Sequence, residues 1–401
     1  MSPNFFSIFS QELQGSLNSQ EITSPTPIQQ KVIPILCNTS SPVLALASTG
    51  SGKTLAYTLP LIHRVSQDRG FKALIVLPTR DLAFQVYKVF NKYHNSLNFN
   101  SSLLCGGRSI KRDNLELSKT PNFIIGTPGR LIYHWEFLKN YPIHTVVLDE
   151  VDRLLDIGFK KEIGLLLKCY PSSRMILFSA TMPKNFQEIT FNKNLLQNLV
   201  KVDLTEIGHQ NPRIEERFVE LPEVTEKYET LLKNLDSNNS TVVFVNTKNS
   251  TRILSRKLAS SNLKVFPYSS DLNPGTKKRT IAQFSNLKSR GEGGVLIATD
   301  IAARGIDFKK LDLVINYDVP LRPTDYIHRI GRTGRADNLG KALTLVAPYE
   351  KKFVENIKRF KETNEQVVLP LKPILLKKGG RAFKTRFLKK DPKRSYRKPP
   401  R

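Results

Sequence analysis

A glycine-rich segment at residues 47–54 carries the clearest chemistry in the sequence. It reads Ala-Ser-Thr-Gly-Ser-Gly-Lys-Thr and stands between an apolar run, Val43–Leu46, and the apolar start of a helix at Leu55–Ile62. Backbone N–H groups in such a turn bind phosphate oxygens, a lysine reaches the β- and γ-phosphates, and a threonine hydroxyl can ligate Mg²⁺. A glycine-rich loop alone is more often a plain turn, and Ala47 replaces the usual first glycine. The Lys-Thr pair between a strand and a helix nevertheless predicts a nucleotide site, formed by Ser48, Thr49, Gly50, Ser51, Gly52, Lys53 and Thr54.

Two adjacent carboxylates, Asp149 and Glu150, follow the apolar run Thr145–Leu148. Alone, such a pair is read as solvated loop charge. Within the same α/β unit as a phosphate loop, Asp149 is suited to hold Mg²⁺ with Thr54, and Glu150 is suited to orient or deprotonate an attacking water. The pair therefore predicts phosphoryl-transfer chemistry.

A basic segment, His328–Arg335, lies far along the chain from both sites. Planar guanidinium groups stabilise charge on a transferring γ-phosphoryl group, so Arg332 and Arg335 are candidate arginine fingers. Alternatively, the segment is a basic loop that contacts a phosphate backbone. If the fingers come from a second domain, hydrolysis requires the two domains to close on each other.

The elements that must position these residues are short apolar runs that alternate twice with helical patterns. Their continuous apolarity indicates parallel strands covered on both faces, with the ligand crevice at the carboxyl ends of the strands. The predicted strands are Val43–Leu46, Ala73–Leu77, Phe123–Ile125, Thr145–Leu148, Met175–Phe178, Val200–Leu204, Glu216–Leu221, Val242–Val245, Val295–Ala298, Leu313–Tyr317 and Ala342–Val346. The pattern predicts two consecutive α/β domains.

The polar, breaker-rich stretch Thr205–Pro212 is typical of a linker. We therefore expect a first domain over residues 1–205, a linker over 206–212, a second domain over 213–365 and a basic, disordered tail over 366–401.

The sequence is strongly basic. Its 401 residues hold 62 Lys and Arg against 35 Asp and Glu, a formal net charge of +27. Residues 371–401 hold 13 Lys and Arg and one acid, Asp391, and so carry +12 of that charge. This excess favours a polyanionic partner, nucleic acid ahead of a membrane surface. Phe383, Phe387 and Tyr396 interleave with the basic residues of the tail, which suits tethering to RNA; the alternative is a solvated charged end.

No apolar run of 18 residues predicts a membrane span, and the first residues lack the pattern of a secretory signal. Cys37, Cys105 and Cys169 are too few and too widely spaced for a disulfide framework or a zinc site. We therefore expect a protein of the reducing cytoplasm, with a nuclear or organellar destination left open.

Nine short motifs occur in a fixed order along the chain. They are Pro25–Gln29, Ala47–Thr54, Pro78–Ala83, Gly106-Gly107, Thr127–Arg130, Asp149–Asp152, Ser179–Thr181, Ala298–Asp307 and His328–Arg335. Each is weak alone, but the ordered set is highly specific and resembles the DEAD-box ATP-dependent RNA helicases from about Phe5 to about Phe360. The resemblance implies two tandem RecA-like parallel-sheet domains joined by a short linker, with ATP and Mg²⁺ as cofactors and RNA as the partner.

The resemblance also implies roles at matching positions. Gln29 would read the adenine edge with two amide hydrogen bonds, and an upstream aromatic ring would stack on the base. The candidates for that ring are Phe5, Phe6 and Phe9. Alternatively, Gln29 is part of a helix start with Thr26 as the N-cap and Pro27 in the first position, and both interpretations can hold together.

Further implied roles concern ribose, RNA and the coupling between sites. Asp307 would contact the ribose, and Ser179 and Thr181 would couple the phosphate site to the RNA path. The residues implied to hold the backbone of one RNA strand are Arg80, Gly107, Thr127, Gly129, Arg130, Thr247 and Thr299. Contacts to phosphate and sugar position RNA without reading its sequence, and 2′-hydroxyl contacts would select RNA over DNA.

The implied cycle is that ATP and RNA close the domains of a monomer, the bound strand bends, and hydrolysis reopens the cleft. Unwinding would then be local, or the enzyme would remodel ribonucleoprotein with protein partners. One alternative is an ATP-gated RNA clamp with little turnover, which the intact Glu150, Arg332 and Arg335 disfavour. A DNA helicase of related build is disfavoured by the motif at Gln29 and by Ser179–Thr181.

Several positions depart from the family pattern. Val151 replaces an alanine, and Asp81 stands where a glutamate is usual. Ser269-Ser270-Asp271 replaces His-Gly-Asp, and Pro274 and Lys277 replace a glutamine and an arginine. Because an ammonium lacks the bidentate geometry of a guanidinium, these changes put the RNA grip of the second domain in question, whereas the ATP chemistry is retained.

Overall fold

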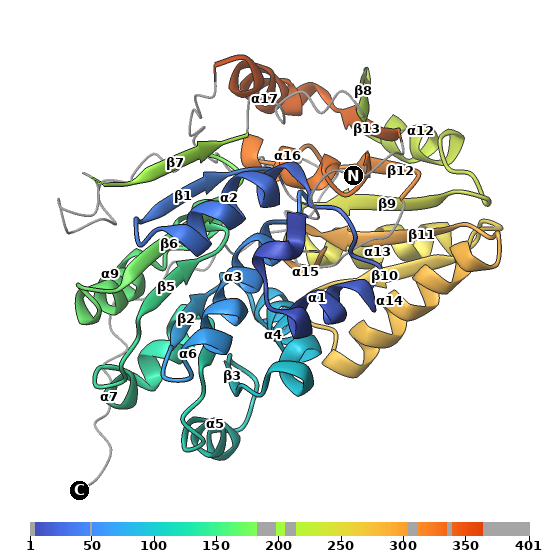
Figure 1. The fold of residues 1–401 in the computed structure, drawn as a ribbon. Helices are drawn as coiled ribbons and strands as arrows, with labels where there is room; N and C mark the ends of the chain where they lie inside the picture. Colours follow the sequence, from blue (N-terminus) through green and yellow to red (C-terminus); the bar gives the residue numbers. More distant parts are fainter. Residues whose placement is uncertain are drawn as a thin grey trace, which may run out of the picture. The chain divides into compact units, whose positions relative to one another are not determined.

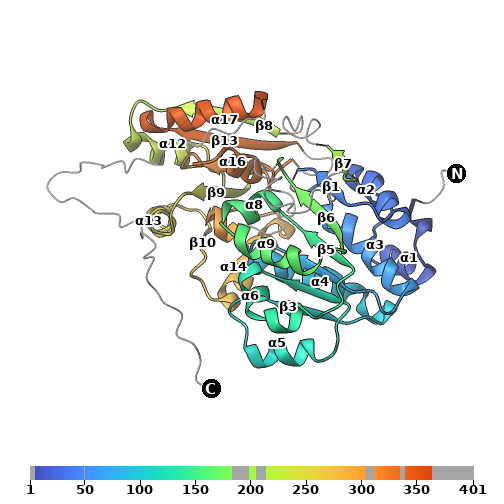
Figure 2. The ribbon, with the colours of Figure 1, turned by 90° about the vertical axis from the view of Figure 1, so that its left-hand side faces the viewer.

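The computed structural model describes residues 5–48, 50–182, 198–204, 214–303, 311–334 and 339–363. These residues form two parallel β-sheets, each covered by helices on both faces, which confirms the predicted fold class (Figures 1 and 2). Thr49, Asp307, Arg335, the predicted linker and the predicted tail lie outside the described residues.

The first sheet has seven strands in the order β3-β4-β2-β5-β6-β1-β7, and every pair is parallel. In chain order the strands are β1 Val43–Leu46, β2 Ala73–Val76, β3 Ser101–Leu104, β4 Phe123–Gly126, β5 Thr145–Leu148, β6 Arg174–Ser179 and β7 Val200–Asp203. The helices are η1 Phe5–Ile8, α1 Gln11–Asn18, α2 Pro27–Asn38, α3 Lys53–Gln67, α4 Arg80–Leu97, α5 Ile110–Leu117, α6 Pro128–Tyr133, α7 Trp135–Leu138, α8 Val151–Asp156 and α9 Lys160–Cys169.

Alternate residues of each central strand enter two separate cores of this sheet. In β1, Val43 and Ala45 pack into one core, and Leu44 and Leu46 pack into the other. Successive side chains of a strand point to opposite faces, so a strand buried on both faces must be apolar throughout. This geometry explains why the central strands show as unbroken apolar runs in the sequence.

The second sheet has six strands in the order β10-β11-β9-β12-β13-β8, again all parallel. The strands are β8 Ile214–Glu220, β9 Ser240–Val245, β10 Val265–Tyr268, β11 Gly294–Thr299, β12 Leu313–Asn316 and β13 Gly340–Val346. The helices are η2 Val224–Glu226, α12 Lys227–Lys233, α13 Lys248–Leu258, α14 Pro274–Ser289, α15 Asp300–Ala303, α16 Pro323–Ile330, η3 Pro348–Glu350 and α17 Lys351–Thr363.

Each of the predicted strands is present, but β3 and β10 were not predicted. Both lie at a sheet edge. Strand β3 begins with Ser101 and Ser102, and β10 contains Pro267, which an edge strand tolerates because it lacks a neighbour on one side. Edge strands are therefore the elements whose composition departs furthest from the apolar pattern.

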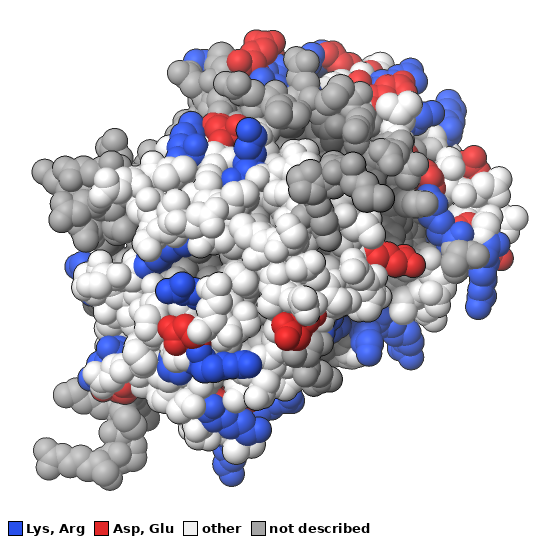
Figure 3. All heavy atoms as spheres, in the orientation of Figure 1, with Lys and Arg blue, Asp and Glu red and all other residues white. Residues whose placement is uncertain are grey.

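Within the described residues, no helix combines the length and apolarity that crossing a membrane requires. On the face shown in Figure 3, basic and acidic side chains are interspersed among large uncharged areas. The positive charge of the described residues is thus not gathered into one patch on that face.

Candidate functional site

The glycine-rich turn lies between the end of β1 and the start of α3, as predicted. The Lys53 ammonium is buried and donates to the Ala47 carbonyl at 2.9 Å, and the Ser51 hydroxyl donates to the Ser48 carbonyl at 2.8 Å. Gly52 is the N-cap of α3 with a φ of +94°, a conformation that favours glycine. Two side-chain bonds therefore tie the end of this segment back to its first residues, and one of them holds the ammonium of Lys53.

Gln29 joins α2 to this turn. Its amide nitrogen donates to the Gly52 carbonyl at 3.1 Å, and its amide oxygen accepts from the Thr26 backbone N–H at 3.0 Å. A Cβ on Gly52 would lie 2.7 Å from the Gln29 amide nitrogen, so the approach requires a glycine. These contacts are those that a helix start at Thr26 predicts for Gln29. The Gln29 side-chain amide still has a second N–H and a second oxygen lone pair for a ligand.

Two of the three candidate aromatic rings are core residues. Phe6 and Phe9 are buried in the core of the first sheet with their rings 6.2 Å apart, whereas Phe5 is partly buried and edge-on to Phe6. Phe5 is therefore the most accessible of the three rings.

Asp149, directly after β5, is a buried carboxylate in an unfavourable environment. Burial raises its pKa to about 6, and the nearby charge of Lys53 opposes that shift. Its two oxygens accept from the Tyr57 hydroxyl at 3.0 Å and from the Glu150 backbone N–H at 2.8 Å. The ionised form would be stabilised by a cation brought into the site.

Glu150 is strained and only partly satisfied. Its φ is +51°, in the left-handed region that a glutamate rarely adopts, and its Oε2 atom is buried with no hydrogen-bond partner among the described residues. An orphaned carboxylate oxygen beside a buried aspartate with a raised pKa fits a divalent cation and an ordered water. The donor set therefore fits Mg²⁺.

Ser179 and Thr181, at the end of β6, are linked to the carboxylate motif through Asp152. The Thr181 hydroxyl donates to Asp152 Oδ2 at 3.1 Å, and the Ser179 hydroxyl accepts from the Asp152 backbone N–H at 3.3 Å. All three side chains are buried. This network holds the end of β6 and the residues just beyond it against the start of α8.

The same carboxylate motif reaches α16, which carries the arginine motif. Arg153 forms an ion pair with Asp325 and a hydrogen bond with His328, and His328 Nε2 lies 3.9 Å from Asp152 Oδ2. Arg322 and Asp156 add an ion pair of 2.9 Å. Side chains of α8 and α16 thus connect the first sheet to the second.

Arg329 fixes α16 to its own sheet. Its guanidinium donates to both carboxylate oxygens of Asp300, at 2.6 and 2.8 Å, and to Asn246 Oδ1 and the Asp318 carbonyl, each at 2.7 Å. Arg332, one turn away, is buried and donates to the His328 carbonyl at 3.2 Å. The buried guanidinium of Arg329 therefore holds the last turn of α16 against the loops that follow β9 and β12 and against the start of α15.

Arg80 and the Gly106-Gly107 pair meet at the carboxyl edge of the first sheet. A Cβ on either glycine would lie 2.8 Å from a terminal nitrogen of the Arg80 guanidinium. Arg80 is exposed at the first position of α4, whose N-cap is Thr79. The glycines therefore leave the space that the Arg80 side chain occupies.

The other residues predicted to hold RNA differ in exposure. Gly129 is exposed and Thr127 is buried, at the start of α6; Thr247 is the exposed N-cap of α13, and Thr299 is buried at the end of β11. Arg130 is bound by Asp113 at 2.6 Å, which leaves its side chain 13% exposed. Its guanidinium is thus mostly engaged within the protein.

Two departures from the family pattern lie in contact. Lys277 of α14 forms an ion pair of 3.1 Å with Asp81 of α4. In the preceding loop, Asp271 accepts from the Ser269 hydroxyl and pairs with Arg252. Asp81 and Lys277 are 196 residues apart in the chain, and each stands where the family usually has another residue. The two side chains therefore form one contact between the two halves of the chain.

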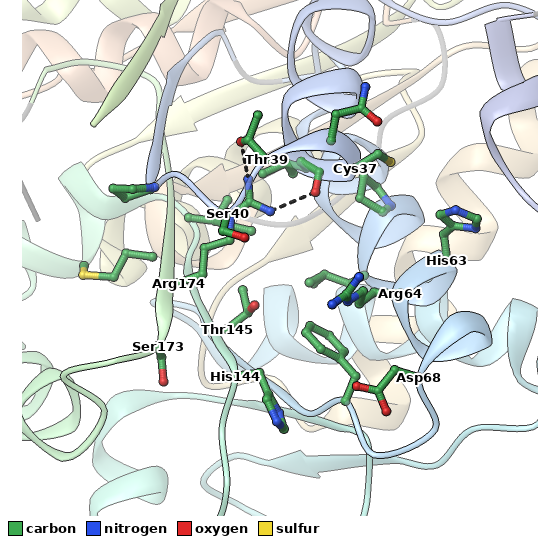
Figure 4. A pocket seen from close by; sticks show the side chains of 18 of the residues that line it. Cys37, Thr39, Ser40, His63, Arg64, Asp68, His144, Thr145, Ser173 and Arg174 are labelled. Carbon is green, nitrogen blue, oxygen red and sulfur yellow. Dashed lines mark hydrogen bonds between the residues drawn. The ribbon is translucent and has the colours of Figure 1, made fainter. Parts of the chain in front are cut away.

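A separate cavity of about 620 Å³ lies at the opposite, amino-terminal edge of the first sheet (Figure 4). There Arg174 donates to the carbonyls of Ile35, Leu36 and Ser41. Those carbonyls lie at and just beyond the last turn of α2, whose first turn carries Gln29. The arginine thus anchors the end of α2 to β6, at the opposite end of the helix from Gln29.

Sequence reasoning missed three residues of these networks. Tyr57 follows Lys53 by one helical turn, so helical periodicity could have placed its hydroxyl near the phosphate turn. Asp152 and Arg329 stand inside recognised motifs and were given no role. Their contacts with Thr181 and with Asp300 require knowledge of the fold.

Comparisons with known proteins agree with this geometry. Residues 26–189 match the model of the DEAD/DEAH box helicase family, and residues 226–337 match the helicase conserved C-terminal domain. The chain is 37% identical over 355 residues to the DEAD-box ATP-dependent RNA helicase RhpA of Helicobacter pylori, covering 86% of this chain and 70% of RhpA. It is 34% identical over 341 residues to the human protein named probable ATP-dependent RNA helicase DDX47, covering 84% and 73%.

Among solved structures, Mss116p bound to ssRNA and AMP-PNP matches with a TM-score of 0.76 and 28% identity, over 90% of this chain and 77% of that one. The segments matched by the two family models contain the phosphate turn, the paired carboxylates and the whole arginine motif, His328–Arg335. The chain therefore belongs to the DEAD-box family of ATP-dependent RNA helicases.

Proposed function

We propose that this protein is an ATP-dependent RNA helicase that hydrolyses ATP when RNA closes its two domains. It would locally separate short RNA duplexes or remodel ribonucleoprotein. The observation that carries the proposal is the group formed by Lys53, Asp149 and Glu150, which has a buried ammonium, a carboxylate with a raised pKa and an orphaned carboxylate oxygen. Buried charged groups with a shifted pKa or an unused hydrogen-bonding atom are typical of sites that bind a charged ligand.

The roles of the residues follow from their positions. The turn from Ser48 to Thr54 would bind the phosphates of ATP, and Gln29 would read the adenine with its remaining N–H and lone pair. Thr54 and Asp149 would hold Mg²⁺, partly through water, and the ion would polarise phosphate oxygens and offset their charge. Glu150 would orient the attacking water and accept its proton.

The second domain would complete the site on closure. Arg332 would stabilise charge on the transferring phosphoryl group. Arg335 and Asp307 lie outside the described residues. The role of Arg335 as an arginine finger and the contact of Asp307 with the ribose stay predictions. The contacts of Arg153 with Asp325 and His328 support closure, because they join the carboxylate motif to α16, the helix that directly precedes Arg332.

RNA would lie across the carboxyl edges of both sheets. Arg80, Gly107 and Gly129 are exposed there on the first half, and Thr247 is exposed on the second. Ser179, Thr181 and Asp152 would couple this path to the nucleotide site, since their buried hydrogen bonds connect the end of β6 to the carboxylate motif. The contacts would be to backbone and sugar, and so independent of sequence.

Strand separation tests the proposal. A short RNA duplex with a single-stranded extension is mixed with the full chain and ATP, with Glu150→Gln as the matched inactive control and a DNA duplex as the substrate control. We expect separation of the RNA duplex by the wild type alone. Tight ATP-dependent RNA binding without separation or turnover would instead identify a clamp, and equal activity on DNA would contradict the RNA assignment.

A further inference from the structure

Tyr133, the last residue of α6, is the most exposed large aromatic side chain among the described residues, at 60%. Single exposed apolar residues are common on protein surfaces and need no function. Tyr133 differs because its ring is backed by a cation: the Arg130 guanidinium carbon lies 5.3 Å from the ring centroid. The ring also meets the His134 ring edge-on, with centroids 5.2 Å apart. A ring that packs against a cation and is still 60% exposed resembles a stacking platform.

The cation behind the ring is held in place. Arg130 Nε donates to Asp113 Oδ2 at 2.6 Å, and its Nη2 donates to the Arg108 carbonyl at 2.7 Å. Asp113 is fully buried and also contacts His134 at 3.1 Å. Because these bonds fix the guanidinium plane, less conformational entropy is lost when a ligand packs on the outer face of the ring.

The position of the ring relative to the RNA path follows from helix geometry. Gly129 and Tyr133 are four residues apart on α6, so they lie on the same face, about one turn or 5.4 Å apart along the axis. A Cβ on Gly129 would meet no atom of the described residues within 4 Å, so none of them covers the surface beside its backbone. The ring thus continues the open face on which Gly129 lies.

We propose that Tyr133 stacks on one base of the RNA strand held at Gly129, a proposal that rests on the proposed function. Every base has a π-face, so the contact would add affinity without sequence preference. The proposal also assigns different roles to two residues of α6. Arg130, engaged by Asp113, would position the ring, and Tyr133 would make the direct contact with RNA.

Equilibrium binding of a labelled single-stranded RNA to the full chain, with a non-hydrolysable ATP analogue, tests this role. Tyr133→Leu removes the ring and keeps apolar bulk, Tyr133→Phe keeps the ring, and Leu165→Ala alters an exposed residue of α9 as a control. We expect Tyr133→Leu to bind about 5- to 10-fold more weakly, with the other two variants within about twofold of the wild type. Thermal melts should coincide, because the side chain is exposed.

A scan with abasic nucleotides separates stacking from other effects. Removing the base that contacts Tyr133 should weaken binding to the wild type and leave binding to Tyr133→Leu unchanged at that one position. The slope of log affinity against log salt should stay the same in Tyr133→Leu, whereas Arg80→Ala should reduce it by about 0.7 if one phosphate contact is lost.

Two failures are distinguishable. If the wild type binds RNA and Tyr133→Leu binds equally well, or if both respond alike to every abasic position, the stacking role is wrong and the helicase proposal stands. If the wild type shows no nucleotide-dependent RNA binding, both proposals are wrong.

Discussion

The carboxylate site of the first sheet and the arginine clamp of the second sheet handle buried charge in opposite ways. Asp149 is buried with a raised pKa, and its neighbour Glu150 has a strained backbone and an oxygen that finds no hydrogen-bond partner in the described part of the chain. Arg329 is equally buried, but two oxygens of Asp300 and the groups of Asn246 and Asp318 accept its N–H donors. We propose that a ligand completes the first arrangement, whereas the hydrogen bonds of Arg329 in the second are made within the protein and hold α16, which ends two residues before Arg332.

Breaking the clamp should have the largest effect on stability. Arg329→Ala removes the paired hydrogen bonds to Asp300 and the donors to Asn246 and Asp318 at a buried site, and should lower the free energy of unfolding by about 3–5 kcal/mol. Arg329→Lys should restore little, because an ammonium cannot reproduce the paired hydrogen bonds. Chemical denaturation measures the loss, and Arg322→Ala, which removes an exposed ion-pair partner, should stay within about 1 kcal/mol of the wild type. A loss equal to that control would contradict the clamp.

Removing the charge of Asp149 should stabilise the ligand-free protein, whereas removing Arg329 should destabilise it. Ionised Asp149 destabilises the ligand-free fold, so Asp149→Asn should raise its free energy of unfolding by about 1–3 kcal/mol at pH 7.5 with chelator present, and should abolish ATP hydrolysis. The pKa of Asp149 is raised to about 6 in the fold from 3.8 in the unfolded chain. The gain should therefore be full above pH 6 and disappear as the pH falls towards 4. Equal stability of the two proteins at pH 7.5 would contradict the comparison.

Tyr57 offers a milder change at the same site. Tyr57→Phe removes the hydroxyl that donates to Asp149 at 3.0 Å and leaves the ring in the core. A hydrogen bond to a charged group contributes about 1.5–3 kcal/mol, so we expect about a 10-fold loss of hydrolysis under subsaturating ATP. The measurement is kcat/KM for ATP with RNA at saturation. An unchanged kcat/KM would mean that Asp149 is positioned without this hydroxyl.

The contact between Asp81 and Lys277 should give the smallest effect. Their side chains are 43% and 16% exposed, so solvent screens the pair and its coupling energy should be about 0.5–1 kcal/mol. Asp81→Lys or Lys277→Asp alone should raise the RNA concentration needed for half-maximal ATPase by a few fold, and the charge-swapped double variant should recover most of the loss. Independent, additive losses would show that the two residues do not act together.

The sequence predicted most of the fold because the central strands are apolar on both faces. It missed β3 and β10, where Ser101, Ser102 and Pro267 interrupt the apolar pattern at a sheet edge. In the site, it predicted the phosphate turn and the two carboxylates from local motifs. The contacts of Asp81 with Lys277 and of Tyr57 with Asp149 join residues distant in the chain, so only the fold brings them together.

Steady-state ATP hydrolysis with and without structured RNA measures whether RNA-driven closure completes the catalytic site. We expect strong stimulation of the wild type by RNA and a rate at least about 100-fold lower for Glu150→Gln at saturating ATP and RNA. Hydrolysis that RNA leaves unchanged, or that survives Glu150→Gln, would contradict the claim that RNA-driven closure completes a site built around Asp149 and Glu150.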